Sequence, residues 1–216
     1  MQSYGSAAPK VICVGLNYRD HANEAAERLP QAPLLFGKFA NTLIGSGETI
    51  VLPPEIGHVD AEAELAIVIA NRVARISEAD ALEAVAGYAC ANDISARDAQ
   101  FGDGQWFRGK SLDTFCPVGP RVVPRAELDV TNLRITQRLN GQSIQDGSTA
   151  DLIFGIAKLV SYASHGITLE RGDLILTGTP HGVGVFRDPK ITLAHGDVVE
   201  VEIEGIGVLR NRVCRG

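Results

Sequence analysis

The chain has 216 residues, enough for one compact domain that buries a sizeable core. Its formal net charge of −6 provides no basic surface for nucleic acid or an anionic membrane, and no segment has the roughly 18 apolar residues of a membrane span. Four widely spaced cysteines without a C-x-x-C pair indicate neither a zinc ribbon nor a disulfide framework. The first ten residues, MQSYGSAAPK, lack the apolar core of a signal peptide. We therefore expect a cytoplasmic protein with neither nucleic-acid nor membrane partners.

Short apolar runs, interrupted by Gly and Pro, predict more strands than helices. Residues 1–9 look like a loose leader, and 10–216 form a single predicted domain. In chain order we expect a strand over 10–16, a helix over 18–29 closed by Pro30, extended segments over 33–39 and 48–54, and a buried strand over 62–70.

Two segments of the capping-box type predict further helices. Residues 77–80 should open a helix over 81–87, and residues 148–151 should open one whose apolar stripe runs from Leu152 to Ala163. The other segments predict a strand over 88–94, a hairpin within 120–145 that turns at Asn140-Gly141, and strands over 173–179, 191–207 and 207–213. This order contains no βαβ repeat, so we expect an α+β fold with a mixed or antiparallel sheet.

The segment GQWFRGKS at 104–111 matches the phosphate-loop pattern G-x-x-x-x-G-K-[ST] at every fixed position. A phosphate loop follows an apolar strand, opens a helix and curls its backbone N–H groups around the phosphate. Here RDAQFGD precedes the segment, Pro117 follows it closely, and the bulky residues WFR stand where small ones are favoured. We therefore reject nucleotide binding, and Lys110 needs another explanation.

Carboxylates gather at the ends of two predicted strands. Glu62 and Glu64 are two residues apart, so on a strand both side chains leave the same face. Two buried carboxylates would repel each other, which a bound cation would relieve; alternatively, both glutamates protrude into water. Asp93 ends another apolar run and favours the cation. Three carboxylates without Cys or His suit Mg²⁺, Mn²⁺ or Ca²⁺ and leave positions for water and substrate.

His21 and Glu24 are three residues apart and share a face of the predicted helix. Such a pair is commonly a surface contact, but Glu24 could also orient the imidazole so that His21 serves as a general base. The spacing alone leaves both interpretations open.

In order and spacing, several segments together resemble the short, single-domain members of the fumarylacetoacetate hydrolase family. The resemblance extends from Val11 to Val213 and rests on the segments GLNYRDHANE, PLLFGKF, HVDAEAELAIVI, GYACANDISARDAQ, WFRGKSLDTFCPVGP, LNGQ and GDLILTGTPHGVG. It implies a β-rich α+β fold with a rolled mixed sheet and few helices, and a homodimer.

The resemblance also implies roles for the residues at matching positions. Glu62, Glu64 and Asp93 match the family's metal ligands, for Mg²⁺ or Mn²⁺ with Ca²⁺ as an alternative, and Lys110 matches the lysine beside metal and substrate. His21 and Glu24 match the catalytic dyad of the acylpyruvate-hydrolase branch. The positions that contact substrate in the family are matched by Arg97, Gln100 and Thr179. This chain departs from the family at Phe39-Ala40-Asn41, where many relatives have proline, and at His181, where small residues are common.

The activity that this resemblance implies is metal-dependent cleavage of a carbon–carbon bond in a 2,4-diketo acid, such as an acylpyruvate, fumarylpyruvate or fumarylacetoacetate-like compound. His21 would activate water, Arg97 and Gln100 would stabilise the oxyanion, and Lys110 with the metal would hold the pyruvate enolate. The same enolate serves isomerisation or tautomerisation of 2-hydroxymuconate-type diacids from aromatic catabolism, and decarboxylation of oxaloacetate. A protein that binds metal or ligand without catalysis is a further alternative.

Overall fold

The structure, a computed structural model, describes residues 8–24 and 28–216. The predicted leader over 1–9 lies largely outside these residues, and so does part of the helix predicted over 18–29. The described part of that helix is α1 (Arg19–Glu24). No helix of the described residues is long and apolar enough to cross a membrane.

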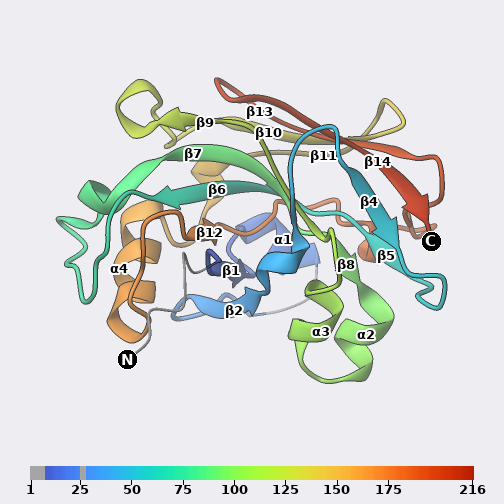
Figure 1. The fold of residues 1–216 in the computed structure, drawn as a ribbon, viewed down its shortest axis with the longest axis horizontal. Coiled ribbons are helices and arrows are strands. Elements are labelled where there is room, and N and C mark those ends of the chain that lie inside the picture. Colours follow the sequence, from blue (N-terminus) through green and yellow to red (C-terminus); the bar gives the residue numbers. More distant parts are fainter. Residues whose placement is uncertain (1–7, 25–27) are drawn as a thin grey trace.

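The chain forms a β-rich α+β fold built on two large sheets and one short strand pair (Figure 1). In spatial order the seven-stranded sheet contains β2 (Leu34–Lys38), β1 (Val11–Gly15), β12 (Leu174–Leu176), β6 (Ala63–Ile69), β7 (Val85–Asn92), β9 (Cys116–Pro124) and β3 (Leu43–Ile44). The five-stranded sheet contains β11 (Gln142–Ser148), β10 (Arg134–Leu139), β13 (Val198–Ile203), β14 (Gly207–Arg215) and β4 (Thr49–Leu52). β5 (Val59–Asp60) pairs with β8 (Ser95–Ala96). Most neighbours are antiparallel, but β1–β12, β3–β9 and β4–β14 are parallel, so the sheets are mixed as expected.

The helices are short and lie around the sheets. Besides α1, they are α2 (Arg97–Gly102), α3 (Trp106–Lys110) and α4 (Ile156–Gly166), with the 3₁₀ turns η1 (Ala40–Thr42), η2 (Ala81–Ala84), η3 (Arg125–Glu127), η4 (Thr149–Asp151) and η5 (Gly184–Phe186). Figure 1 shows α2 and α3 packed side by side at one end of the seven-stranded sheet. The site described below lies where these helices, α1 and β6 meet.

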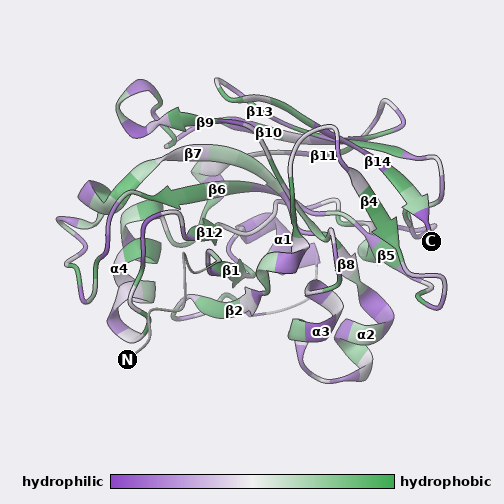
Figure 2. Cartoon of the chain, viewed as in Figure 1, coloured by the Kyte–Doolittle hydropathy of each residue, from purple (hydrophilic) through white to green (hydrophobic). Residues whose placement is uncertain are grey.

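The two faces of β6 separate the main core from the functional site. Leu65, Ile67 and Ile69 pack into the main hydrophobic cluster, which also contains Ile135 and Val201 of the five-stranded sheet. The opposite face continues from Glu64 through Ala66 into a smaller cluster rich in Ala and Cys. Hydrophobic residues run along most of β6 (Figure 2). This alternation is the one predicted from the sequence, and it turns the two glutamates away from the main core.

Both capping-box segments form shorter helices than predicted. Ser77 Oγ accepts a hydrogen bond from the Asp80 N–H, but only η2 follows, because Val85 already pairs with Ile69 as β7 begins. Ser148 Oγ accepts from the Ala150 N–H and introduces η4, whereas α4 starts only at Ile156. Pairing with neighbouring strands and loops outweighs the local helix signal at both places. The strand predicted over 191–207 is likewise confined to β13.

Other local predictions agree with the structure. The hairpin of β10 and β11 turns at Asn140-Gly141, where both residues have the positive φ angles of a tight two-residue turn. The four cysteines are free, and Cys13, Cys90 and Cys116 are buried.

Candidate active site

A cavity of about 380 Å³ opens among α1, α2, α3 and the start of β6. Its polar lining consists of His21, Glu62, Glu64, Arg97, Gln100, Lys110 and Thr179. These are seven of the nine residues to which the sequence assigned roles. The other two lie just behind the wall, where Glu24 contacts His21 and Asp93 contacts Lys110. The fold therefore gathers every predicted site residue, from segments up to 158 positions apart, around one cavity.

The three predicted metal ligands come together because β6 and β7 are antiparallel neighbours. Ala63 pairs with Asn92, which places Glu62 and Glu64 at the start of β6 beside Asp93 at the end of β7. The Asp93 N–H donates to the Glu62 carbonyl oxygen over 2.9 Å. One carboxylate oxygen from each residue lies within 4.8 Å of the others, and all three residues are buried. The glutamates therefore do not protrude into water.

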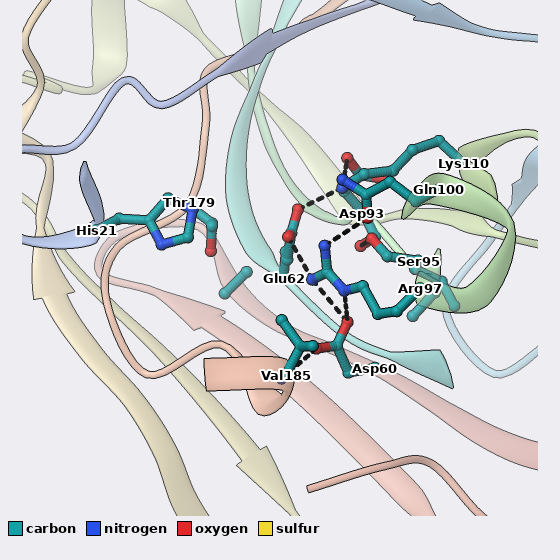
Figure 3. A network of polar contacts seen from close by, with 12 residues as sticks. His21, Asp60, Glu62, Asp93, Ser95, Arg97, Gln100, Lys110, Thr179 and Val185 are labelled. Carbon is teal, nitrogen blue, oxygen red and sulfur yellow. Dashed lines mark hydrogen bonds and ion pairs between the residues drawn. The ribbon is translucent and has the colours of Figure 1, made fainter. Parts of the chain in front are cut away.

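Three buried cations surround these carboxylates. Lys110 Nζ, at the end of α3, lies 2.6 Å from Glu62 Oε2 and 2.8 Å from Asp93 Oδ2. Lys38 Nζ, at the end of β2, lies 2.5 Å from Asp93 Oδ1, and Arg97 Nη2 lies 2.6 Å from Glu62 Oε1. Figure 3 shows Lys110 and Arg97 reaching Glu62 from two directions.

The ionisation of the two glutamates differs because their neighbours differ. Burial opposes ionisation of Glu62, but the charges of Lys110 and Arg97 outweigh it and hold the pKa of Glu62 well below its usual range. Burial and the negative charges of Asp93 and Glu62 raise the pKa of Glu64 well above its usual range. Glu64 accepts a hydrogen bond from the Gly178 N–H at 2.7 Å and has no ion pair among the described residues.

This donor set fits a divalent cation. Around the cavity, four buried carboxylates of the described residues (Asp60, Glu62, Glu64 and Asp93) face three cations (Lys38, Arg97 and Lys110), so the carboxyl groups outnumber the cations by one. Glu64 is the carboxylate without a cationic partner, and it lies on the cavity wall. Clustered carboxylate oxygens suit a hard ion such as Mg²⁺, Mn²⁺ or Ca²⁺.

His21 faces the carboxylate cluster from the other side of the cavity (Figure 3). Its Nδ1 lies 3.2 Å from Glu24 Oε2, and its ring packs edge-on against Phe186. Burial opposes ionisation of Glu24, but hydrogen bonds from His21 and from the Gly182 N–H lower its pKa. An ionised Glu24 orients the His21 ring and leaves Nε2 to face the cavity, the arrangement required of a general base.

Thr179 and Gln100 each accept a hydrogen bond from a neighbouring side chain, which leaves their own N–H or O–H groups free to donate. Gln145 Nε2 donates to Thr179 Oγ1 over 2.8 Å, so the Thr179 hydroxyl hydrogen remains available to a ligand. Arg97 Nη1 donates to Gln100 Oε1 over 2.8 Å, which leaves the Gln100 amide N–H groups as donors. Both side chains can therefore donate hydrogen bonds to substrate oxygens.

The segment that matched the phosphate-loop pattern forms α3 and presents Lys110 to carboxylates. Of its bulky residues, Phe107 packs on Phe39, and Arg108 pairs with Asp103 near the surface. Trp106 instead lines the cavity with Phe36, whose ring lies 5.5 Å from Lys110 Nζ.

Two buried residues of the site were missed from sequence, Lys38 and Asp60. Lys38 is the one charged residue in the apolar extended segment PLLFGKF. A lysine buried in such a segment needs a carboxylate partner, and this is the sequence signal by which Lys38 could have been found. Asp60 lies two residues before Glu62, in the same alternation, and both of its oxygens are used by distant segments.

A family model described as fumarylacetoacetate (FAA) hydrolase C-terminal matches residues 10–214. The chain is 46% identical over 206 residues to oxaloacetate tautomerase Fahd2a, mitochondrial, of Rattus norvegicus. It is 45% identical over 207 residues to oxaloacetate tautomerase FAHD2A, mitochondrial, of Homo sapiens. Each alignment covers 94% of this chain and 66% of the relative, so the chain spans about two thirds of their length.

Solved structures share the fold over nearly the whole chain. A 5-carboxymethyl-2-hydroxymuconate delta-isomerase from Mycobacterium smegmatis matches with a TM-score of 0.87 and 43% identity, covering 97% of this chain and 80% of that one. A 2-hydroxyhepta-2,4-diene-1,7-dioate isomerase from Mycobacterium marinum matches with a TM-score of 0.86 and 41% identity, covering 96% and 75%.

Proposed function

The chain belongs to the fumarylacetoacetate hydrolase family, and we propose that it is a divalent-metal-dependent tautomerase or isomerase of a short 2-oxo acid. The observation that carries the proposal is the buried group of Glu62, Glu64 and Asp93 with Lys110 beside it, on one wall of a cavity whose other wall presents His21. Such a site favours an enolate on one side and proton transfer on the other.

The names of the relatives support proton transfer more than hydrolysis. The mammalian proteins are named oxaloacetate tautomerases, and the two mycobacterial structures are named isomerases of unsaturated diacids. Both kinds of reaction move a proton between carbon and oxygen through an enol or enolate. We accordingly favour this activity over the carbon–carbon bond hydrolysis that the sequence led us to expect.

Each residue has a separate part in the proposed reaction. Glu62, Glu64 and Asp93 would hold Mg²⁺ or Mn²⁺, which would polarise the substrate's 2-oxo group as a Lewis acid. Thr179 donates to a substrate carboxylate, while Arg97 and Gln100 face developing negative charge. Lys110 adds a fixed positive charge near the enolate oxygen.

His21 moves the proton in this scheme. In the direction from keto to enol, Nε2 removes a proton from the carbon next to the carbonyl, and the same proton is delivered to the enolate oxygen. The reverse direction uses the same steps, so no proton is gained or lost overall. Glu24 stabilises the imidazolium that forms between the two transfers.

Hydrolysis of a 2,4-diketo acid is the second candidate, and the His21–Glu24 pair is the observation that favours it. A histidine oriented by a carboxylate also activates water, and the cavity is large enough to admit it. Decarboxylation of oxaloacetate would use the same enolate.

The test compares these reactions on one preparation. Purified protein with Mg²⁺ or Mn²⁺ is given oxaloacetate, a 2-hydroxymuconate-type diacid, acetylpyruvate and fumarylpyruvate, and enol absorbance, pyruvate and carbon dioxide are followed. We expect tautomerisation or isomerisation to be fastest, and Glu64→Ala to abolish it. Faster release of pyruvate from an acylpyruvate would establish hydrolysis instead. Full activity of Glu64→Ala would refute the metal site, and inactivity on all four substrates with both metals would refute the proposal.

We further propose that the protein is a homodimer acting on small keto or diketo acids in the cytoplasm. The mammalian relatives are named as mitochondrial, so cell fractionation tests the compartment. Sedimentation velocity tests the dimer, and a single species of monomer mass at micromolar concentration would contradict it.

A further inference from the structure

Asp60 is a buried carboxylate behind the cavity wall. It ends β5, is 3% exposed, and pairs through its backbone with Ser95 of β8. It does not line the cavity. Figure 3 shows it between Arg97 and the backbone of Val185. A carboxylate in this position contacts no substrate, so its contribution depends on what its two oxygens hold.

The two oxygens bind different elements. Asp60 Oδ1 accepts from Arg97 Nε at 2.7 Å, on α2. Asp60 Oδ2 accepts from the Val185 N–H at 2.7 Å, on η5. These are charge-assisted hydrogen bonds in a buried setting, the kind that fixes orientation most firmly.

Each of these elements carries one half of the proposed chemistry. Arg97 continues from Asp60 to Glu62 and Gln100, on the wall that contains the carboxylate group. The segment around η5 continues to the opposite wall, where the Phe186 ring packs edge-on against His21 at 5.8 Å. In the same segment the Gly182 N–H donates to Glu24 Oε1 over 2.9 Å.

The close approach of η5 to Asp60 depends on a glycine. A Cβ atom at Gly184 would lie 2.2 Å from the Ile191 carbonyl oxygen, 2.9 Å from Asp60 Cβ and 3.2 Å from Asp60 Oδ2. A larger residue there would clash with the Ile191 backbone and with Asp60 and so displace η5. The absence of a side chain at Gly184 therefore allows η5 to approach Asp60 this closely.

We propose that Asp60 is a positioning residue that fixes the placement of Arg97 relative to the His21–Glu24 pair across the cavity. The inference rests on the proposed function, because it assigns Arg97 and His21 to one reaction. A misplaced base or cation costs rate far more than it costs ligand binding, since only the transition state needs both groups at once.

The test uses Asp60→Asn, which keeps the size of the side chain but replaces one acceptor oxygen with an amide donor. Asp173→Asn is the matched control. Asp173 is also buried and accepts from two backbone N–H groups, those of Lys10 and Glu170, and pairs with the Lys10 ammonium. It lies before β12, whereas the site contacts the segment after β12.

Activity and ligand binding are measured separately. Oxalate imitates the planar enolate of a 2-oxo acid, and the single tryptophan, Trp106, lies in the cavity wall and reports its binding by fluorescence. We expect Asp60→Asn to lower kcat by about 10–100-fold, the loss that commonly follows when a hydrogen-bonding partner that orients a metal-binding side chain is removed. The Kd for oxalate with Mg²⁺ should change less than about 3-fold, in line with the transition-state argument. Asp173→Asn should keep kcat within about 2-fold, because it removes nothing from the site.

Two further measurements connect the effect to both walls. In an Arg97→Ala or His21→Ala background, Asp60→Asn should cost much less than in the wild type, because the groups that it positions are absent. Phe186→Ala is a second variant that should fold, because Phe186 is 39% exposed; it should lower kcat with little change in the Kd for oxalate. Equal, additive losses in every background, or full kcat in Phe186→Ala, would overturn the proposal.

Hydrogen exchange tests the bridge without relying on activity. Amides of residues 184–186 should exchange faster in Asp60→Asn than in the wild type and unchanged in Asp173→Asn. Unchanged exchange in Asp60→Asn would refute the bridge even if the enzyme is active. Conversely, a wild-type protein that converts no 2-oxo acid would refute the proposed function while this exchange difference still establishes the bridge.

Discussion

Lys38 shows how a single buried residue sets the charge of the site. Its ammonium contacts Asp93 Oδ1 and the Ile94 carbonyl oxygen, and its side chain is fully buried. The variant Lys38→Met keeps much of the apolar stem but leaves Asp93 with Lys110 as its one remaining cation among the described residues. Removing one partner of a buried ion pair costs about 3–5 kcal/mol of unfolding free energy. We expect a loss of that size in urea unfolding without metal.

The control for this experiment is Lys10→Met. Lys10 also pairs with a buried aspartate, Asp173, at 2.6 Å, but its own side chain is 40% exposed. Exposed pairs contribute about 0–1 kcal/mol, so this variant should lose little. Similar losses in the two variants would show that burial of the lysine is not what makes Lys38 important.

Glu24 makes the site sensitive to acid. Its pKa is lowered in the folded protein, despite burial, by hydrogen bonds from His21 and the Gly182 N–H. A lowered pKa contributes stability above the ordinary value of 4.5, and that contribution is lost as pH falls through the folded pKa. Glu24→Gln should therefore melt below the wild type at pH 7, and the difference should shrink in acid.

The same variant should lower kcat about 10–100-fold at pH 7, because the glutamine cannot stabilise an imidazolium. Thermal melts between pH 3 and pH 7, together with kcat at pH 7, check both effects. A melting difference that stays constant with pH would contradict the assignment of Glu24 as an ionised partner of His21.

Glu62, Glu64 and Asp93 stand in local patterns that the sequence shows, whereas Lys38 and Asp60 are recognised only through distant partners. Glu62, Glu64 and Asp93 were found because strand alternation and strand ends are local patterns. Lys38 is 55 positions from Asp93, and Asp60 is 37 positions from Arg97 and 125 from Val185. Nothing local says that these groups meet, so their roles depend on the tertiary fold.

Among the elements, α3 owes its position to the second glycine of the segment that matched a phosphate loop. A Cβ atom at Gly109 would lie 2.6 Å from the Gln100 N atom and 2.7 Å from the Ala96 carbonyl oxygen. This glycine lets α3 pack directly on α2, which places Lys110 beside Glu62 and Asp93. The segment GQWFRGKS thus uses its glycine for helix packing and its lysine for charge.

Gly109→Ala tests this role of the glycine. The added methyl group must push apart two backbone segments, so we expect a loss of about 1–3 kcal/mol in urea unfolding. Displacement of Lys110 by about 1 Å would lower kcat about 100-fold. Gly102→Ala, at the end of α2 with no atom within 4 Å of the new Cβ, should preserve both stability and kcat. Wild-type activity in Gly109→Ala would contradict the packing argument.

Several elements were predicted with the wrong bounds, because an element's ends depend on distant segments of the chain. The turn at Asn140-Gly141 was found because its chemistry is local. The helix after residues 77–80 was extended too far, because Val85 joins β7. The helix after residues 148–151 was predicted to start too early, because Leu152 forms a bridge with Tyr18. A capping signal indicates where a helical turn starts. The length of the helix depends on whether the following residues instead pair with strands or other segments.

At the scale of the whole molecule, the buried charged groups around the cavity lower the stability of the metal-free fold. Burying charges is costly even when they are paired, and the described part of the chain buries one more carboxylate than cations around the cavity. This cost is seen in the raised pKa of Glu64. The metal-free folded protein favours protonated Glu64, whereas the unfolded chain has the ordinary carboxyl pKa. Metal binding would favour the ionised form and relieve the cost.

The sign of this linkage gives a prediction for the metal-free protein. A carboxyl whose folded pKa is raised adds stability below its unfolded pKa, about 4.5, and that stability is lost as pH rises through the folded value. Protein treated with EDTA should therefore lose stability, relative to a Glu64→Gln variant, as pH rises from 5 to 8. Saturating Mg²⁺ or Mn²⁺ should cancel this loss in the wild type, adding about 2.7 kcal/mol at a hundredfold excess over Kd. The same metals should not stabilise Glu64→Gln to that extent. Urea unfolding at each pH measures the stability of wild type and Glu64→Gln, each with and without metal. If wild-type stability has the same pH dependence and the same response to metal as that of Glu64→Gln, then the pKa of Glu64 is not raised by the fold and Glu64 does not bind the metal.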